Sequence, residues 1–474
     1  MKLSCLKLLP LALAATLVVT PTFAHAEDLM QAYQQALAND PTLAGQLAQR
    51  NSTNENVPLA RSNLLPQLSA GLSLNQENGS TTVSNANGSM LPGATVGHSR
   101  TRNLSLQLNQ TILNFSDYAN LSAAKSQREA ANATYQAALQ DLIVRVTTAY
   151  FDVLTAKDAV DFNQANTDSL KRQYDQSRER FKAQLVAITD VQDAKAAYDS
   201  ALADLIAAKN SLNDAREALT QITGHPVNNL EVLSTRLPMT PPSPNNLGTW
   251  VKAAEANNPT LLASQYTVDA ADHSVTAARD ARLPTIGATV SYGKGATWYQ
   301  NGPYYNAPGH TSIGLSLNIP LFTGGAMHAQ IKQAIYQRDS AQASLTTQKR
   351  AVVRNTRNYF RSVTSGISQV EAAKAAVVSS QSALKATQAG LSVGTQTIVN
   401  VLIAQGNLMS AREQYSQARH AFILNKLFLK EAAGALTVQD LKLVNALLVP
   451  ASEVPSLTPT DANGDDTMPA PSAG

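Results

Sequence analysis

The side chains that could carry out covalent or metal chemistry are few in this 474-residue chain, and they are not grouped. The sequence has no nucleophile motif of Ser, His and Asp and no glycine-rich phosphate loop. Its one cysteine, Cys5, excludes a zinc site built from cysteines. The histidines beyond residue 26 lack the spacing of metal ligands; they are His98, His225, His273, His310, His328 and His420. The sequence therefore predicts a protein that is not an enzyme and that uses no cofactor or metal.

Residues 1–26 have the pattern of a secretory signal peptide. A basic start with Lys2 and Lys7 precedes an apolar run over residues 8–19, and Ala24-His25-Ala26 provides a small-x-small cleavage site. A membrane anchor is the alternative, but the apolar run is short for one. Removing these two lysines from the 37 basic residues leaves 35 against 34 acidic ones. This balance argues against nucleic-acid binding, which needs a basic face.

The rest of the chain contains one unit of about 210 residues twice. Asp40-Pro41-Thr42-Leu43 returns as Asn258-Pro259-Thr260-Leu261. Tyr150-Phe151 returns as Tyr359-Phe360, pairs that we expect to pack between helices, and Gly224 returns as Gly434. Each copy holds two kinds of element, pairs of strands and very long helices, and these elements must position any functional residue.

Four segments alternate between apolar and polar residues with period two, as strands do. They run from Leu68 to Asn75, Asn103 to Asn109, Thr285 to Tyr292 and Ser312 to Ile319. An ordinary half-buried sheet would show the same pattern. Two loops are expected between them, a polar one over 76–101 and one over 293–310 that carries Trp298, Tyr299, Tyr304 and Tyr305. Small uncharged polar faces and aromatic strand ends favour membrane-crossing strands, and because four strands cannot close a barrel, several chains must pool theirs.

Two stretches predict helices too long for a globular domain. Residues 116–223 contain neither Gly nor Pro, and residues 321–449 contain no Pro. Apolar seams run along both stretches, at Leu139, Leu142, Val146, Ala149 and Val153 and at Val352, Thr356, Tyr359, Val363, Ile367 and Val370. Breaks at 184–188 and 390–397 divide each stretch into a long helix, a tip and a shorter return helix. Thr189 and Gln192 have the spacing of a capping box for the first return helix, and Gly224 and Gly434 are expected to end the two.

These features resemble the TolC family of outer-membrane efflux and secretion channels. The resemblance covers residues 27–450 and rests on local signatures such as Leu64-Leu65-Pro66-Gln67-Leu68, Thr148-Ala149-Tyr150-Phe151, Arg180-Phe181, Val186 to Gln192, Ser392-Val393-Gly394-Thr395 and Thr397-Ile398-Val399. It implies an α+β membrane protein in which three chains pool twelve strands into one transmembrane β-barrel and their long helices into a periplasmic tunnel. This homotrimer would lie in the outer-membrane lipid. It would act as the passive exit duct for a periplasmic adaptor and an inner-membrane pump of the RND, ABC or MFS type.

The expected organisation follows from this resemblance. It comprises a signal peptide (1–26), N-terminal helices (27–65), a first β-hairpin (66–112), a first helical hairpin (113–224, tip near 183–189), an equatorial linker (225–248), a second N-terminal helix (249–283), a second β-hairpin (284–322), a second helical hairpin (323–434, tip near 390–400), an equatorial segment (435–450) and a disordered tail (451–474). Two transport functions stay open: efflux of drugs and other amphiphiles, and secretion of unfolded proteins.

The resemblance also assigns a gate to the helix tips, and this chain departs from it. The family's Tyr and Arg correspond to Leu391 and Gln396, and its ring of two aspartates corresponds to Asn400 and Ile403. Asp190 and Asp193, beside Thr189, share one helix face in the first copy and could ring the entrance instead. In the alternative interpretation, the two acids only favour a helix N-terminus. Leu391 and Ile403 are candidates for an apolar constriction that gates by dewetting.

Adaptor docking is expected at both tips, through Arg180, Phe181, Leu185 and Val186 in the first copy and Ser392, Val393, Gly394 and Thr395 in the second. The rival interpretation is a trimeric surface adhesin, which also joins a barrel to coiled coils. Adhesins carry their barrel once, at the C-terminus, whereas strand pairs occur here inside each repeat. The repeat therefore favours a conduit.

Overall fold

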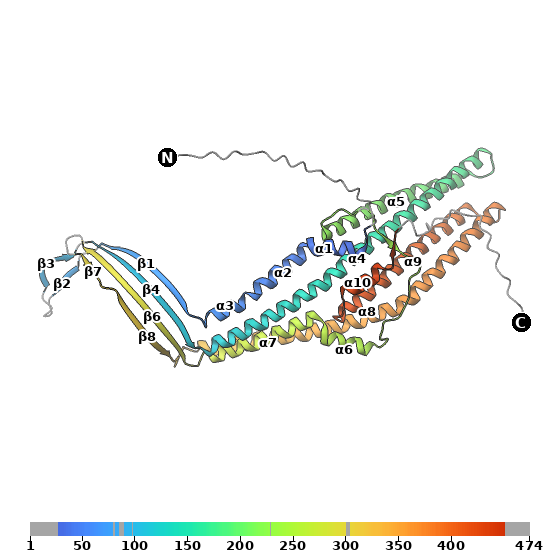
Figure 1. Ribbon diagram of the computed structural model, residues 1–474. Helices are drawn as coiled ribbons and strands as arrows, with labels where there is room; N and C mark the ends of the chain where they lie inside the picture. Colours follow the sequence, from blue (N-terminus) through green and yellow to red (C-terminus); the bar gives the residue numbers. More distant parts are fainter. Residues whose placement is uncertain are drawn as a thin grey trace, which may run out of the picture.

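The computed structural model describes residues 27–78, 81–84, 90–96, 98–227, 229–299 and 304–450. The signal peptide and the tail expected at the two ends of the chain lie outside these residues. The molecule is elongated, with a sheet of strands at one end, paired helical tips at the other and a smaller cluster of elements between them (Figure 1). The two repeats lie side by side along the long axis.

Two β-hairpins form the main sheet. β1 (Gln67–Glu77) pairs antiparallel with β4 (Ser99–Leu113), β4 pairs with β6 (Thr285–Tyr299), and β6 pairs with β8 (His310–Asn318). The hairpin of each repeat therefore forms as predicted, and β4 and β6 join the two. One face is an apolar row across all four strands, with Leu68, Leu108, Val290 and Ile313 in register, and the other has Ser69, Gln107, Ser291 and Ser312. Ser291 and Ser312 are hydrogen-bonded at 2.8 Å between their hydroxyl oxygens.

Both expected loops are shorter than predicted, because strand pairing continues where the apolar alternation stops. Arg100 donates to the Gln76 side chain at 3.3 Å across the extended first hairpin, and β2 (Thr81–Ser84) pairs with β3 (Met90–Val96) inside the expected polar loop. β6 continues to residue 299, and β7 (Tyr305–Asn306) pairs with it. Gly295 lies in this strand, where a Cβ would come within 2.7 Å of the Asn103 side-chain oxygen.

Trp298 and Tyr304 lie at the far end of this sheet, with ring centroids 5.2 Å apart. Both side chains are about half exposed in the single chain. The expected aromatic belt at the strand ends stays a prediction, since the side chains of residues 299 and 305 lie outside the described residues.

Short helices precede each β-hairpin. The first repeat has α1 (Leu29–Asn39), α2 (Pro41–Asn54) and α3 (Asn56–Ser62), and the second has α6 (Leu247–Asn257) and α7 (Pro259–Asp280). The single helix expected over 249–283 is therefore wrong. Pro259 has no N–H to continue the preceding helix, and the Asn258 side chain accepts from the N–H of Leu261 at 3.1 Å to start a new one. Asp40 caps α2 through the N–H of Leu43 at 2.9 Å in the same way.

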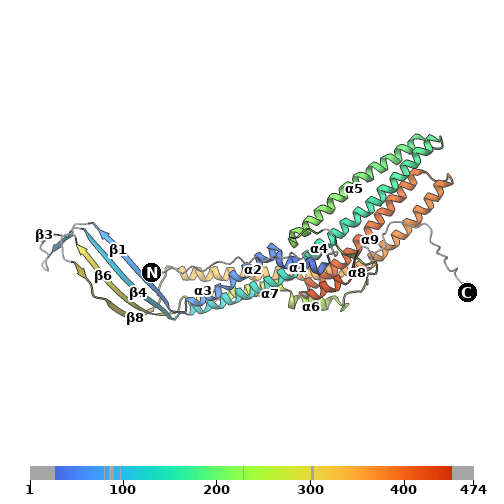
Figure 2. The same cartoon turned by 45° about the horizontal axis from the view of Figure 1, so that its top comes forward.

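Two helical hairpins form the rest of the wall. α4 (Phe115–Lys182) returns as α5 (Ile188–Thr223), and α8 (Ala326–Ser392) returns as α9 (Ile398–Ala432). α4 would be about 100 Å long at 1.5 Å per residue. Figure 2 shows α5, α4, α9 and α8 side by side, with both tips pointing away from the sheet. Both predicted seams are inside: Leu142, Val146, Val352 and Val363 are buried, and Tyr359 and Ile367 are partly covered.

The predicted capping box at Thr189 is wrong, because the cap position lies two residues earlier in the chain. α5 starts at Ile188 with Ala187 as its cap residue, and no side chain caps it. In the second copy, the residue equivalent to Ala187 is Thr397, whose hydroxyl accepts from the N–H of Asn400 at 3.4 Å. Gly224 ends α5 and Gly434 follows α9, both with positive φ, as predicted.

The equatorial segments of the two repeats meet midway along the molecule. β5 (Val232–Leu233) pairs with β9 (Leu448–Val449), and α10 (Val438–Asn445) packs beside α1. The main core lies here and includes Tyr150 and Phe151, which are fully buried as predicted. The Tyr150 hydroxyl lies 3.0 Å from the Glu231 carbonyl oxygen and 3.1 Å from that of Glu27. None of the described helices carries an apolar stretch long enough to cross a lipid bilayer.

Candidate functional site at the helix tips

The tip of the first hairpin is a tight turn that closes a Schellman motif. The N–H of Leu185 donates to the Arg180 carbonyl at 2.9 Å, and that of Gln184 donates to the Phe181 carbonyl at 2.8 Å. These bonds satisfy carbonyls that the helix end would leave open. Gln184 takes φ +61°, a left-handed conformation that glycine usually occupies.

The second tip repeats these two backbone hydrogen bonds. Thr395 donates its N–H to the Gly390 carbonyl at 2.9 Å, and Gly394 donates to the Leu391 carbonyl at 3.2 Å with φ +81°. The two repeats therefore present the same backbone shape at the same end, although their side chains differ. A channel entrance assembled from such tips would be lined by both kinds.

The predicted gate residues gather at these turns. Asp190 is half-buried and Asp193 is exposed, one helical turn apart, and neither makes a side-chain hydrogen bond or ion pair in the described part of this single chain. Thr189 is exposed beside them. In the second tip the Asn400 amide donates to the Gln396 side chain at 2.7 Å, Leu391 is partly covered, and Ile403 is 56% exposed. A hydrogen bond between two uncharged side chains thus lies where the resemblance led us to expect charged groups.

The predicted docking residues form the outermost surface of both tips. Leu185 is 68% and Val393 is 73% exposed, and Phe181 is 40% exposed. Ser392, Gly394 and Thr395 are exposed as well, whereas Arg180 and Val186 are half-buried. Apolar side chains at the end of a long projecting hairpin make a contact surface that a single chain does not cover.

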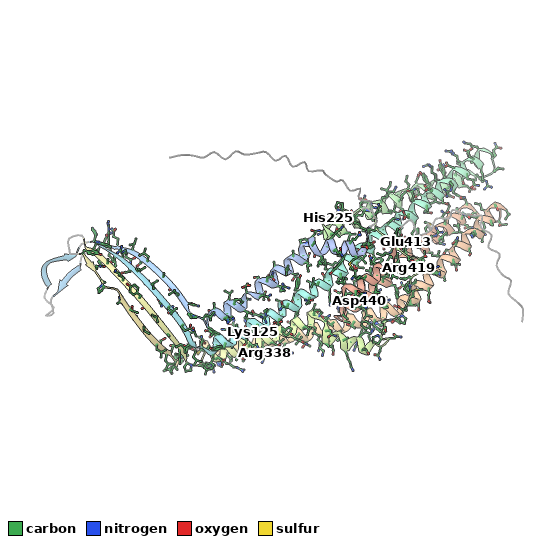
Figure 3. The ribbon with its side chains drawn as sticks, viewed as in Figure 1. Lys125, His225, Arg338, Glu413, Arg419 and Asp440 are labelled. Atoms are coloured by element: carbon green, nitrogen blue, oxygen red, sulfur yellow. The ribbon has the colours of Figure 1, made fainter. Side chains whose placement is uncertain are left out.

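A second set of polar residues, which the sequence did not reveal, lies between α4 and α9. The Thr155 hydroxyl lies 2.8 Å from Nδ1 of His420, and Ser416 donates to the Asp158 carboxylate. Burial lowers the pKa of His420 to about 3 and raises the pKa of Asp158. Figure 3 labels Arg419 in this region, where its guanidinium donates to the Ser234 carbonyl. These partners are too far apart in the chain for any local pattern to predict them.

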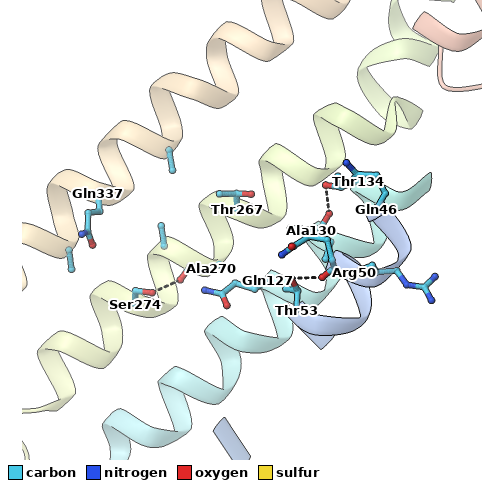
Figure 4. Close-up of a pocket in the computed structure, with 15 residues that line it drawn as sticks. Gln46, Arg50, Thr53, Gln127, Ala130, Thr134, Thr267, Ala270, Ser274 and Gln337 are labelled. Atoms are coloured by element: carbon cyan, nitrogen blue, oxygen red, sulfur yellow. Dashed lines mark hydrogen bonds between the residues drawn. The ribbon is translucent and has the colours of Figure 1, made fainter. Parts of the chain in front are cut away.

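The helices between the equator and the sheet line an open hollow. It has a volume of about 510 Å³ and is lined by α2, α4, α7 and α8 (Figure 4). Its lining is mostly uncharged, with Gln46, Gln127, Thr134 and Gln337 among the residues, and Arg50 is its one charged side chain. A neighbouring hollow of about 470 Å³ shares Gln46 and Thr134 with it as lining residues. Within the described residues, no group of acidic, His or Cys side chains could hold a metal ion.

Strand pairs at one end and paired tips at the other, repeated twice, define a class of protein: elongated channels of the outer membrane. The family described as Outer membrane efflux protein matches residues 32–225 and 250–435. The chain is 38% identical to Outer membrane protein TolC of Escherichia coli over 459 residues, covering 95% of this chain and 91% of TolC. It is 27% identical to Alkaline protease secretion protein AprF of Pseudomonas aeruginosa over 436 residues, covering 91% and 89%.

Among solved structures, the CmeC outer membrane channel of Campylobacter jejuni has a TM-score of 0.74, with 18% identity and coverage of 89% of this chain and 90% of that one. The chain belongs to the outer membrane efflux protein family. It is an outer-membrane channel of the efflux and secretion type with a periplasmic tunnel, and it is not an enzyme. Channels of this family are trimeric and work with efflux-pump partners.

Proposed function

We propose that three copies of this chain form a passive exit duct whose periplasmic entrance is closed by the helix tips. The observation that carries this proposal is the open sheet: β1 and β8 are its edges, each with one partner strand among the described residues. Unpaired strand edges cannot face lipid, so copies must pair edge to edge. The apolar row on one face would then meet lipid, and the Ser and Gln row would meet water.

The first test is the conductance of the purified protein in planar lipid bilayers. Gel electrophoresis of unheated samples checks that the protein is a trimer. A stepwise single-channel conductance is expected. A folded trimer that conducts no ions would contradict the proposal and would favour the adhesin that the repeat pattern argued against.

The entrance of this chain is proposed to close through apolar contacts. Leu391 and Ile403 would form a constriction that excludes water, since neither position carries a charge that could lock the tips. Replacing both by serine should raise the resting conductance about tenfold or more, because a wetted constriction no longer presents a desolvation barrier. Single-channel recording compares this variant with Ser382→Ala, a control at an exposed position of α8 away from the turn. Equal conductance would exclude an apolar gate.

Asp190 and Asp193 are proposed to supply the field at the entrance. Three chains would place six carboxylates there, which would concentrate cations and repel anions. The Asp190→Asn/Asp193→Asn variant should therefore lose most of the cation selectivity while it keeps its trimer. The measurement is the reversal potential under a salt gradient, and a control is Asp199→Asn, further along the same helix and paired with Lys195 at 2.9 Å. An unchanged reversal potential would contradict this proposal and would favour the alternative, in which the two acids only stabilise a helix N-terminus.

The exposed apolar tips are proposed to receive a periplasmic adaptor that connects the duct to an inner-membrane pump of the RND, ABC or MFS type. Leu185→Asp/Val393→Asp would place charges where apolar contact is needed, and export in cells should fall about tenfold or more. Both side chains are exposed in the turns beyond the last helical residues, so conductance in bilayers should stay unchanged. If export is unaffected, docking does not use these residues.

A further inference from the structure

The seams inside each helical hairpin are mostly apolar. On α5 the buried residues that face α4 include Val191, Ala194, Ala201 and Leu205. On α8 and α9 they include Val363, Val370 and Phe422. Separating such surfaces exposes apolar area to water without compensation. Each hairpin is therefore expected to move as one body.

The seam between the hairpins, where α4 lies against α9, changes character along its length. Near the equator it is apolar, since Val146, Tyr150 and Leu154 of α4 share one core with Ile423 and Leu427 of α9. This part anchors the two hairpins to each other and to the equatorial elements.

Toward the tips the same seam becomes polar. Thr155 meets His420, Asp158 accepts from Ser416, and Gln405 bonds both Asn166 at 3.3 Å and Ser169 at 3.2 Å. Within the described parts of α4, α5, α8 and α9, every hydrogen bond between side chains of two different helices lies in this zone. The α9 partners are shielded from solvent: Gln405, Ser416 and His420 are each at most 9% exposed.

Polar contacts of this kind separate more readily than apolar ones, because both partners regain hydrogen bonds with water. Two buried ionisable groups add to this. Burial raises the pKa of Asp158 and lowers the pKa of Arg419, and Arg419 Nε has no hydrogen-bond partner. Contact with water would relieve both groups.

We infer that the side chains bonded across this seam form a separable latch, which sets how far the second hairpin swings from the first about the apolar equatorial anchor. The latch consists of Thr155, Asp158, Asn166 and Ser169 of α4 and Gln405, Ser416 and His420 of α9. This inference rests on the proposed function, a duct closed at its tips. In this chain the latch holds the hairpins together at mid-height, because the tips themselves share no polar link among the described residues.

The test compares Ser416→Leu with Ser410→Leu in planar bilayers. The first variant removes the donor to the Asp158 carboxylate and adds bulk inside the latch, whereas Ser410 is exposed on the same helix. Without Ser416 the Asp158 carboxylate can recover a hydrogen bond only from water, which favours separation of the two helices. Ser416→Leu should therefore raise the mean resting conductance about threefold or more. Ser410→Leu should match the unaltered protein. Equal conductance of the two variants would overturn the inference.

A cross-link tests the opposite direction and remains informative if Ser416→Leu fails to fold. Asp158→Cys/Ser416→Cys adds two thiols to a chain whose one cysteine lies in the expected signal peptide. A short bifunctional thiol reagent should lower conductance, and cleaving the bridge with a reductant should restore it. A bridged trimer that conducts like the reduced one would overturn the latch. The absence of conductance in the unaltered trimer would instead overturn the proposed duct.

Discussion

Replacing Gly434 by alanine should prevent the trimer from forming. Gly434 has φ +68°, and a Cβ there would collide with the Asn257 carbonyl oxygen and lie 2.7 Å from the Asn258 Cα. Both obstacles are backbone atoms, so no side chain can move aside to make room. The Asn258 amide also donates to the Ala432 carbonyl at 3.0 Å, which ties α7 to the end of α9 at this point. The clash and the left-handed backbone together should cost about 3–5 kcal/mol.

The measurement is the yield of heat-sensitive trimer on gels and the melting temperature in detergent. Gly406→Ala is the matched control, because Gly406 lies inside α9 with nothing within 4 Å of an added Cβ. That variant should gain about 1 kcal/mol from helix propensity. If Gly434→Ala forms trimers as well as Gly406→Ala does, the close approach of Gly434 to the backbone of Asn257 and Asn258 is not needed for assembly.

Replacing Glu431 by glutamine should stabilise the protein above neutral pH. Glu431 is half-buried near the end of α9, and burial raises its pKa to about 7, with the charge of Asp141 adding to the shift. Its folded pKa thus exceeds its unfolded value, so the folded state binds this proton more tightly. The associated stability is present at low pH, and it is lost as the pH rises from the unfolded pKa to about 7.

At pH 8 the buried carboxylate should cost about 3 kcal/mol and at pH 5 about 1 kcal/mol. Melting temperatures of Glu431→Gln should therefore exceed those of the unaltered protein at pH 8 and approach them at pH 5. Glu371→Gln, at an exposed position on α8, is the control. A stabilisation that is equal at both pH values would mean that Glu431 acts through packing and not through its charge.

Local patterns in the sequence predicted most of the architecture. Period-two alternation located both hairpins, and the long stretches without proline located α4 and α8, because each pattern is contained within its own element. The Asn258–Pro259 break was missed even though Asp40-Pro41 in the first copy offered the same signal. The capping box at Thr189 failed because its spacing is a common one and the chain starts the helix at Ile188 instead.

The contacts between elements could not be predicted in the same way. Asp158 and Ser416 come from different repeats, and either would be an ordinary helical residue by itself. Nothing in the repeat predicts their pairing, because the first-copy counterpart of Ser416 is Ile206, which is 63% exposed. Duplication thus predicted what the two halves share, and the structure was needed for what distinguishes them.

The two tips have the same backbone shape, but only the first carries charged side chains. Between Lys385 and Arg412 the second copy has no charged residue, whereas Arg178, Glu179, Arg180, Lys182, Asp190 and Asp193 surround the first tip. In a trimer the entrance would therefore be surrounded by alternating charged and neutral tips, three of each kind. A partner that binds all six tips would lose affinity in high salt only at the three charged tips. Varying the ionic strength would therefore distinguish the two kinds of contact, although the two turns have the same backbone shape.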